Sequence, residues 1–355
     1  MNDAADAPAV AAPPRVVDVV TLGESMVTFL PARPGRLADV PAFHRAIGGA
    51  ESNVACALAA FGHSVRWVGR VGADGFGDHL VGAIAAHGVD VTYVRRDPVR
   101  PTGVYFRTAQ DRATAGHEVA YYRAGSAASA MSVADLDLDA VLAARVLHLS
   151  GITAALSEDC RRLLYELTAP RPGRPLISFD VNHRPALWRH ADGPRVLREL
   201  ARRADIVFVG ADEAGQLWGL HGARAVRAAL PEPGEVVVKQ GSAGATAFAR
   251  RPDTQDVATS VPAPRVDVVA ATGAGDAFAA GFLSATLRGL PAETRLRHGH
   301  LFAAAALTAP GDLAEPPSRG HADRLAARSP AAWGRLRLGP GWTRAGAAEE
   351  ETSTP

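Results

Sequence analysis

Cysteine is scarce in this sequence, which has only Cys56 and Cys160 among its 355 residues. Two cysteines are too few for a disulfide framework and match no metal-ligand spacing, so the sequence favours a reducing compartment. An excess of charge of one sign is also absent, because 38 basic and 37 acidic residues give a formal net charge of +1. Binding to nucleic acid or to an anionic membrane is therefore not expected.

Long apolar runs are absent as well. No stretch approaches 18 consecutive apolar residues, and residues 1–14 have neither the basic start nor the apolar run of a signal peptide. We expect a cytoplasmic protein with disordered tails over 1–14 and 339–355. The 12 histidines form no His-Glu-x-x-His pair, so no zinc site is assigned. Apolar residues are abundant at 47%, enough to bury a large core in one large or two ordinary domains.

The most informative stretch, residues 268–283, joins a Thr-Gly-Ala-Gly-Asp turn to an apolar helix. Gly273 and Gly275 have no side chains that would keep an anion away from the backbone. The four N–H groups from Gly273 to Asp276 can therefore converge on a phosphate at the positive end of that helix. Asp276 could then take a proton from a hydroxyl while the loop holds the charge that develops in phosphoryl transfer. The alternative is that Asp276 only caps the helix.

Alternating strand and helix patterns predict one α/β domain over residues 15–338. Strands are expected at 15–22, which should be buried at the sheet centre, and at 65–71, 145–150, 176–181, 205–209 and 235–239. Helices are expected at about 52–61, 78–87, 158–167 and 194–203. Residues 91–123 instead alternate aromatic and β-branched residues with polar turns, which predicts hairpins outside the main sheet.

Two separated blocks carry a resemblance to the ribokinase-like (PfkB-type) sugar kinases. They are Gly-Gly-Ala-Glu-Ser-Asn-Val-Ala at 48–55 and Ala-Thr-Gly-Ala-Gly-Asp-Ala-Phe-Ala-Ala-Gly-Phe at 271–282. Within that family, residues 121–130, 147–153 and 180–188 resemble 2-keto-3-deoxygluconate kinases, and the last stretch is shared with fructokinases. The resemblance implies a Rossmann-like, mostly parallel sheet flanked by helices, with a small β-sheet lid from about 28–46 and 91–123. It also implies ATP and Mg²⁺ as cofactors, Asp276 as general base, and at least a homodimer, since relatives often pair through the lid.

The resemblance further implies a sugar site. The residues expected to contact the sugar are Gly49, Ala50, Glu51, Asn53, Tyr105, Tyr121, Arg123, Arg184, Asp276 and Asp312. The planar guanidinium of Arg123 suits a carboxylate, as a sugar acid would present. A helix-start role for Asn53 and a solvated hairpin position for Arg123 remain alternatives.

The nucleotide site is implied in the same way. Its expected residues are Asn182, Arg184, Lys239, Gly241, Gly244, Gly273, Gly275 and His300. Glu213 matches an acidic residue that organises Mg²⁺ through water, although a glutamate at a helix start could merely favour the helix dipole.

Three positions depart from the family pattern. Gly210 stands where Asn or Ser is usual, and His300 stands where relatives often place Asn beside adenine. Ala270 stands where many relatives have an Asp that helps to build a monovalent-cation site. The expected reaction is phosphorylation of 2-keto-3-deoxygluconate (2-dehydro-3-deoxy-D-gluconate) at its terminal hydroxyl. The alternatives within the family are a fructokinase or another kinase of ketoses or sugar acids.

Two alternatives come from other functional classes. An NAD-type Rossmann enzyme is disfavoured because the Gly-x-Gly pattern lies near the C-terminus and not in a first βα turn. A sugar-sensing protein without catalysis is disfavoured by the presence of Asp276.

Overall fold

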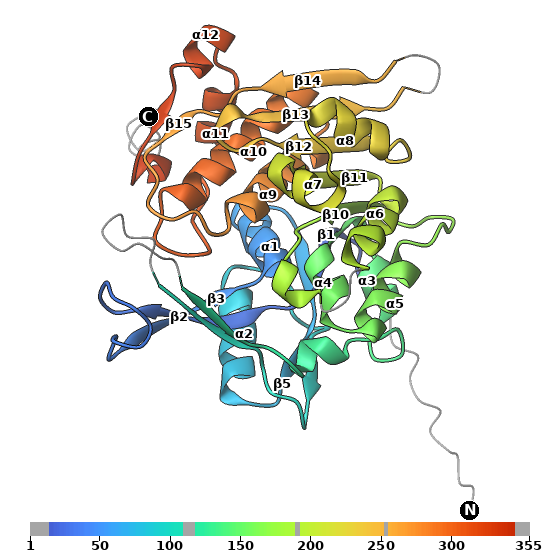
Figure 1. Cartoon of the computed structure of the whole chain (residues 1–355), viewed down its shortest axis with the longest axis vertical. Coiled ribbons are helices and arrows are strands. Elements are labelled where there is room, and N and C mark those ends of the chain that lie inside the picture. Colours follow the sequence, from blue (N-terminus) through green and yellow to red (C-terminus); the bar gives the residue numbers. More distant parts are fainter. Residues whose placement is uncertain (1–13, 109–117, 189–191, 252–254, 345–355) are drawn as a thin grey trace, which may run out of the picture.

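An eight-stranded sheet runs through the middle of the molecule (Figure 1). The computed structural model describes residues 14–108, 118–188, 192–251 and 255–344. In spatial order the strands are β14 (Val257–Val261), β13 (Ala245–Ala249), β12 (Glu235–Lys239), β11 (Ile206–Gly210), β10 (Leu176–Asp180), β9 (Ala144–Ser150), β1 (Val17–Leu22) and β4 (Val65–Val68). All neighbours from β4 to β12 pair in parallel, whereas β13 and β14 are antiparallel additions.

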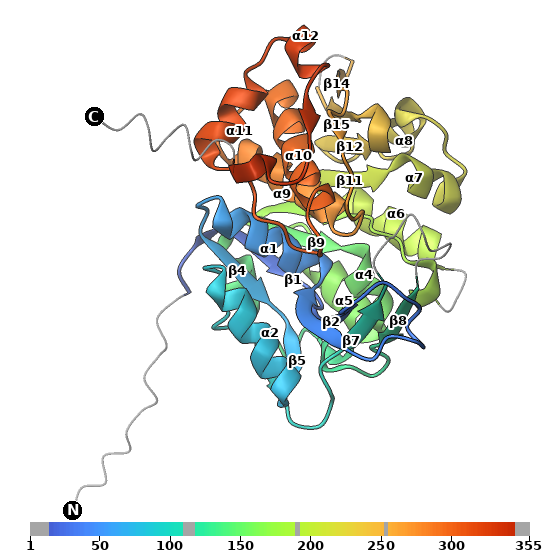
Figure 2. The same ribbon diagram turned by 90° about the vertical axis from the view of Figure 1, so that its left-hand side faces the viewer.

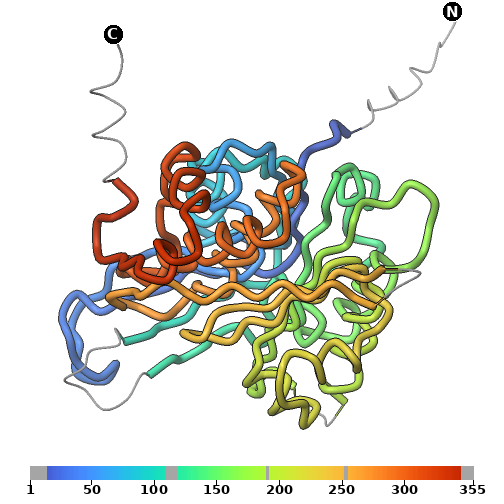
Figure 3. Tube along the Cα trace, turned by 90° about the horizontal axis from the view of Figure 1, so that it is seen from above, coloured from blue at the N-terminus to red at the C-terminus, as the bar shows by residue number. Residues whose placement is uncertain are grey.

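Helices cover both faces of this sheet, as Figures 2 and 3 show. One face carries α1 (Ala50–Ala60), α2 (Gly75–Ala86), α9 (Ala274–Leu287), α10 (Ala292–Leu307), α11 (Arg319–Ala326) and α12 (Pro330–Trp333). The other carries α3 (Leu138–Leu142), α4 (Gly151–Leu156), α5 (Glu158–Leu167), α6 (Gly193–Arg203), α7 (Ala211–Trp218) and α8 (Ala223–Ala229). Because strand side chains alternate, Val237 of β12 joins one core while Val236 and Val238 join the other.

A separate four-stranded sheet, the lid, lies beside the carboxyl ends of the parallel strands. Its order is β3 (Phe43–Gly48), β2 (Met26–Pro31), β7 (Val104–Arg107) and β8 (Val119–Tyr122). Phe106 stacks on Phe29 at 4.7 Å between ring centroids and meets Phe43 edge-on at 5.3 Å, so the lid has its own aromatic core. β7 and β8 form the expected hairpin; residues 109–117 between them lie outside the described part of the chain.

The predicted fold class is confirmed, and three details differ from expectation. The strand predicted at 65–71 is divided at Gly69, where a Cβ would lie 2.7 Å from the Trp67 ring; β5 (Arg70–Gly72) then pairs with β6 (Arg95–Asp97). Strand β1 is second from the sheet edge instead of central.

The third difference is the C-terminal boundary. Trp342 is buried in the core and begins the short helix η4 (Trp342–Arg344), so packed chain extends beyond the boundary predicted at 339. Nearby, β15 (Arg265–Val266) pairs with β16 (Arg337–Leu338). Within the described ranges, no helix has the length and apolar character needed to cross a membrane.

Candidate active site

The N-terminus of α9 lies between the main sheet and the lid. Gly273 precedes the helix with φ of 77°, a left-handed conformation that favours glycine, and a Cβ there would overlap the carbonyl oxygen of Asp312. No side chain of the described residues caps this helix end. The first-turn N–H groups, including those of Ala274 and Gly275, therefore remain available to an anion. This geometry fits the anion-binding turn that the sequence predicts.

Asp276, in the first turn of α9, is held by two amides. Asn53 donates from Nδ2 to Oδ2 at 2.9 Å, and Asn182 donates from Nδ2 to Oδ1 at 3.4 Å. Asn182 itself has φ of 42°, a left-handed conformation that asparagine tolerates better than most residues. The carboxylate is thus aimed at side chains from α1 and from the end of β10. The capping alternative for Asp276 is not what the structure shows.

The electrostatic surroundings suit Asp276 to proton transfer. Desolvation by burial raises the pKa of Asp276 to about 6; the hydrogen bond from Asn53 lowers it, and the nearby Asp180 raises it. Arg184 and Lys239 favour the ionised form. The carboxylate is therefore mostly ionised at neutral pH yet basic enough to accept a proton, as a general base must be.

A cavity of about 90 Å³ adjoins Asp276 and lies under the lid. Its lining includes nine of the residues predicted to contact sugar, namely Gly49, Ala50, Asn53, Tyr105, Tyr121, Arg123, Arg184, Asp276 and Asp312. The tenth, Glu51, does not line the cavity. Its side chain is fully buried and accepts hydrogen bonds from Ser150 (2.7 Å) and Thr153 (2.8 Å), which fix the start of α1. Burial raises the pKa of Glu51 to about 7.

Asp312 ties the lid to the main domain. It accepts hydrogen bonds from the Tyr105 hydroxyl and from Arg107 Nη2, the latter at 2.6 Å, and all three side chains are buried. A Cβ at Gly48 would overlap the Tyr105 hydroxyl, so the glycine makes room for this contact. Arg107 is missing from the sequence-based prediction. Its spacing of two from Tyr105 in a strand is the signal that places both side chains on one face.

Arg123 is not free in the cavity wall. Its Nε donates to Glu24 Oε2 at 2.7 Å, its Nη2 also contacts that oxygen, and Ser126 donates to Glu24 Oε1 at 2.6 Å. Glu24 is fully buried and follows Gly23 at the carboxyl end of β1. The sequence analysis did not single out Glu24. Its position just past a parallel strand, where ligands of α/β sheets bind, could have drawn attention to it.

A larger cavity of about 610 Å³ lies on the other side of the α9 N-terminus. Five predicted nucleotide residues line it, namely Lys239, Gly241, Gly244, Gly275 and His300; Asn182, Arg184 and Gly273 do not. Arg184 and Gly273 line the smaller cavity instead. Gly241 begins the short helix η3 (Gly241–Ala243), and Gly244 follows it directly. Both of these glycines have positive φ.

The walls of the larger cavity suit a planar base. Val266, Val268, Phe278 and Leu307 supply apolar surface along its sides. His300 contacts the Val261 carbonyl oxygen at 3.1 Å, and burial lowers the pKa of His300 to about 4, so the imidazole is neutral. An apolar slot with a few polar groups at its rim is the usual form of a nucleotide base site.

Charged side chains gather where the two cavities approach each other. Lys239, which is the only lysine of the sequence, lies 2.7 Å from Asp180 Oδ2, whereas Asp180 Oδ1 has no hydrogen-bond partner among the described residues. Burial lowers the pKa of Lys239, but Asp180 and Glu213 outweigh this, and the net direction is upward. The ammonium group therefore stays protonated beside the turn that carries Gly275.

Glu213, for which the resemblance implies a role toward Mg²⁺ through water, accepts two backbone hydrogen bonds. One of its oxygens accepts the backbone N–H of His183 and the other accepts that of Gly210 at 3.0 Å, so both oxygens cap backbone groups. Burial and then Asp180 raise the pKa of Glu213. The geometry favours the structural alternative for Glu213. The buried, unpartnered oxygen of Asp180 fits a hydrated Mg²⁺ better, since Mg²⁺ in such sites keeps waters and takes few carboxylates.

Comparison with known proteins agrees with this geometry. The model of the pfkB family carbohydrate kinases matches residues 17–319. The chain belongs to this family. As a pfkB carbohydrate kinase it is a phosphotransferase that uses an alcohol group as acceptor.

Relatives within the pfkB family differ in their sugars. The 2-dehydro-3-deoxygluconokinase of Bacillus subtilis (strain 168) is 35% identical over 309 residues, covering 85% of this chain and 93% of that protein. Probable fructokinase-6, chloroplastic, of Arabidopsis thaliana is 33% identical over 295 residues, covering 80% and 75%. A solved structure of an uncharacterised sugar kinase from Pyrococcus horikoshii in complex with ATP is 25% identical, with a TM-score of 0.74 and coverage of 88% and 99%.

Proposed function

We propose that this protein is a cytoplasmic kinase that transfers the γ-phosphate of ATP to the terminal hydroxyl of 2-dehydro-3-deoxy-D-gluconate. The observation that carries this proposal is the position of Asp276. Its carboxylate faces the small cavity under the lid, while Gly275, one residue earlier, lines the large cavity on the other side. A hydroxyl in the first cavity and a phosphate at the edge of the second would meet at the N-terminus of α9.

The residues at this junction have different roles in the proposed phosphoryl transfer. Asp276 takes the proton of the attacking hydroxyl, and Asn53 and Asn182 keep its carboxylate oriented. The N–H groups of the turn from Gly273 onward stabilise charge on the transferred group. Lys239 adds a fixed positive charge close to Gly275, where a Cβ would lie 3.4 Å from its Nζ. Asp180, whose Oδ1 lacks a hydrogen-bond partner among the described residues, would hold Mg²⁺ through water, and the ion when bound would neutralise further phosphate charge.

The choice of a sugar acid is supported by the cavity wall. Arg123 and Tyr121 line the small cavity, and the Arg123 guanidinium lies 5.6 Å from the centroid of the Tyr121 ring. A guanidinium that receives a carboxylate makes a charge-assisted pair, which a neutral hexose cannot offer. The similarity to a 2-dehydro-3-deoxygluconokinase supports the same choice.

Fructose phosphorylation is the second candidate, and one specific observation favours it. Glu24 already neutralises Arg123, which weakens the attraction of that wall for an anion. Similarity to a fructokinase at 33% identity is nearly as high as similarity to the acid kinase.

The test is acceptor-dependent release of ADP from ATP across a panel of keto acids and hexoses. We expect kcat/KM for 2-dehydro-3-deoxy-D-gluconate to exceed that for fructose by at least about tenfold, since one charge-assisted hydrogen bond contributes roughly 1.5–3 kcal/mol. A higher kcat/KM for fructose would make fructokinase the preferred function. The absence of acceptor-dependent ADP release with every sugar would instead support a sugar-sensing protein.

A variant of the cavity wall sharpens this test. Arg123→Leu should raise KM for the acid while leaving the slow reaction with fructose nearly unchanged, because only the acid uses the guanidinium. Arg36→Leu is a matched control, since Arg36 is an exposed lid arginine paired with Asp39 outside the cavity. An equal loss of both activities in Arg123→Leu would contradict carboxylate recognition by Arg123.

A further inference from the structure

Glu24 is a buried charge in the sugar cavity whose role the proposed function does not use. It lies in the short connection between β1 and β2 and is one of the residues around the same cavity as Asp276. The side chain has no exposed area. A Cβ at Gly103, where the chain enters β7, would lie 2.9 Å from Glu24 Oε1. A buried carboxylate in such a tight space is stable only if its charge is compensated, and Arg123 compensates it.

The contact uses one particular edge of the Arg123 guanidinium. Both Nε and Nη2 face Glu24 Oε2, which leaves Nη1 and the second proton of Nη2 for another acceptor. A substrate carboxylate can therefore still bind, at the end of the guanidinium opposite to Glu24. It would do so against the negative charge of Glu24, roughly 8 Å away across the planar group.

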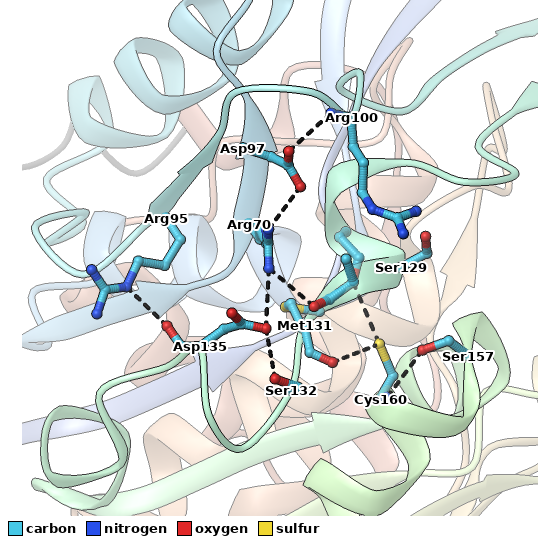
Figure 4. A network of polar contacts seen from close by, with 12 residues as sticks. Arg70, Arg95, Asp97, Arg100, Ser129, Met131, Ser132, Asp135, Ser157 and Cys160 are labelled. Atoms are coloured by element: carbon cyan, nitrogen blue, oxygen red, sulfur yellow. Dashed lines mark hydrogen bonds and ion pairs between the residues drawn. The ribbon is translucent and has the colours of Figure 1, made fainter.

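The segment that carries Ser126, the second partner of Glu24, is fixed in place. Directly after Ser126, η1 (Ala127–Ala130) leads into a loop that is held from two sides, as Figure 4 shows. Arg70 bridges Asp97 (2.8 Å) and Asp135 (3.1 Å) and also donates to the Ala130 carbonyl oxygen, while Cys160 donates to the Met131 carbonyl oxygen at 3.5 Å. These contacts hold the chain that directly follows Ser126 and so support the position of this partner of Glu24.

We propose that Glu24 is a specificity-determining residue, which sets how strongly the cavity prefers anionic over neutral acceptors. By pairing with Arg123 it keeps the guanidinium in position for hydrogen bonding but cancels much of its charge. The wall therefore recognises a carboxylate mainly by the geometry of its hydrogen bonds, and it remains tolerant of a neutral sugar. This inference rests on the proposed binding of the acceptor in this cavity, and it does not depend on which acceptor the wild-type enzyme prefers.

The test compares kcat/KM for 2-dehydro-3-deoxy-D-gluconate with kcat/KM for fructose in the wild type and in Glu24→Gln. Glutamine keeps the shape and an acceptor for Arg123 while removing the charge. Removing a like charge at roughly 8 Å with an effective dielectric constant of about 20 should raise the acid-to-fructose ratio roughly tenfold to thirtyfold. The change should appear in KM for the acid, with kcat retained, because Asp276 is untouched. Asp39→Asn removes an equal charge at an exposed lid position and should leave the ratio unchanged.

A second variant separates charge from packing. Glu24→Gln with Arg123→Gln removes both charges without leaving one of them buried and unpaired, and its acid-to-fructose ratio should fall at least about tenfold below wild type. The single and double variants should thus move in opposite directions. If Glu24→Gln does not fold, as thermal unfolding would show, the double variant is compared with Arg123→Gln, which retains the Glu24 charge, and should have the higher acid-to-fructose ratio. A ratio within twofold of wild type in the folded single variant, or equal ratios in the double variant and Arg123→Gln, would overturn the inference.

The two proposals can fail separately. If neither acceptor is phosphorylated, the proposed function fails, and calorimetric binding of gluconate and of the neutral glucitol to the same variants tests Glu24. Selectively tighter binding of gluconate to Glu24→Gln is then the expected result. Equal affinities of gluconate for wild type and Glu24→Gln would overturn the role of Glu24.

Discussion

Replacing Asp276 by Asn tests the proposed chemistry most directly. Asparagine keeps the size of the side chain and can still accept a hydrogen bond from Asn53, but it cannot take a proton. We expect turnover to fall by about 10² to 10⁴, the range typical of general-base removal, while affinity for the acceptor largely survives. Asp267→Asn is a matched control, because Asp267 lies on the same approach to α9 but is half-exposed and paired with Arg337 at 2.8 Å.

The pH profile gives this prediction a second, independent readout. Since the pKa of Asp276 is raised to about 6, kcat/KM of the wild type should increase from pH 5 to pH 7 and then level off. The base is active only when ionised, so activity is lost as pH falls through that value. The residual activity of Asp276→Asn should lack this acidic limb.

The free energy of unfolding should rise in Asp276→Asn, whereas the activity of this variant should fall. A carboxyl group whose pKa is about 6 in the folded state, against 3.8 in the unfolded chain, disfavours folding once it is ionised. Below about pH 3 the group is neutral in both states, and the cost grows as pH rises to about 6. At pH 8 we expect Asp276→Asn to unfold with a free energy about 1–3 kcal/mol higher than wild type, and the difference should vanish at about pH 3. Denaturant unfolding at both pH values measures it.

The assay for activity is a coupled measurement of ADP, together with rapid quenching to isolate the chemical step. Asp276→Asn with half of the wild-type turnover, when chemistry limits the rate, would refute the assignment of Asp276 as the base. An unchanged acidic limb in that variant would refute it as well.

Two further predictions concern the surroundings of the site. Ala270 provides no carboxylate for a monovalent cation and Asp267 is directed to Arg337, so replacing Na⁺ by K⁺ at constant ionic strength should leave the rate nearly unchanged; a several-fold rise would contradict this. Strand β8 is the edge of the lid sheet and exposes Tyr121 (49%) and Tyr122 (66%), so we expect at least a homodimer that covers this edge. A monomeric mass by light scattering at micromolar concentration would exclude it.

The parts of the site that the sequence predicts are those encoded by neighbouring residues. The turn from Gly273 to Asp276 could be recognised because its glycines and the apolar helix behind it stand in one short stretch. The strands of the parallel sheet could be placed because buried strands read as continuous apolar runs. Gly69 shows the limit of such patterns. β-branched residues stand on both sides of it, and the pattern does not indicate that a Cβ at this position would lie 2.7 Å from the Trp67 ring.

The pairing of distant charges could not be predicted in this way. Glu24 and Arg123 are 99 residues apart, and the residues next to each in the sequence give no sign that the fold brings the two together. Glu213 illustrates the converse, because its residue type suits both metal binding and helix capping. Its two oxygens accept hydrogen bonds from the backbone N–H groups of His183 and Gly210, and the sequence alone does not place these donors beside it.

The solitary lysine at the meeting point of the two cavities has a practical consequence. Reagents that acylate amines find one side-chain target in this chain, Lys239, and that ammonium is held by Asp180 with only 19% of its side chain exposed. Covalent attachment of a side chain of this sequence to an amine-reactive surface would therefore have to use this one, largely buried lysine. In a cell, acetylation or ubiquitin attachment at a lysine side chain could occur at this one position alone, beside the nucleotide cavity.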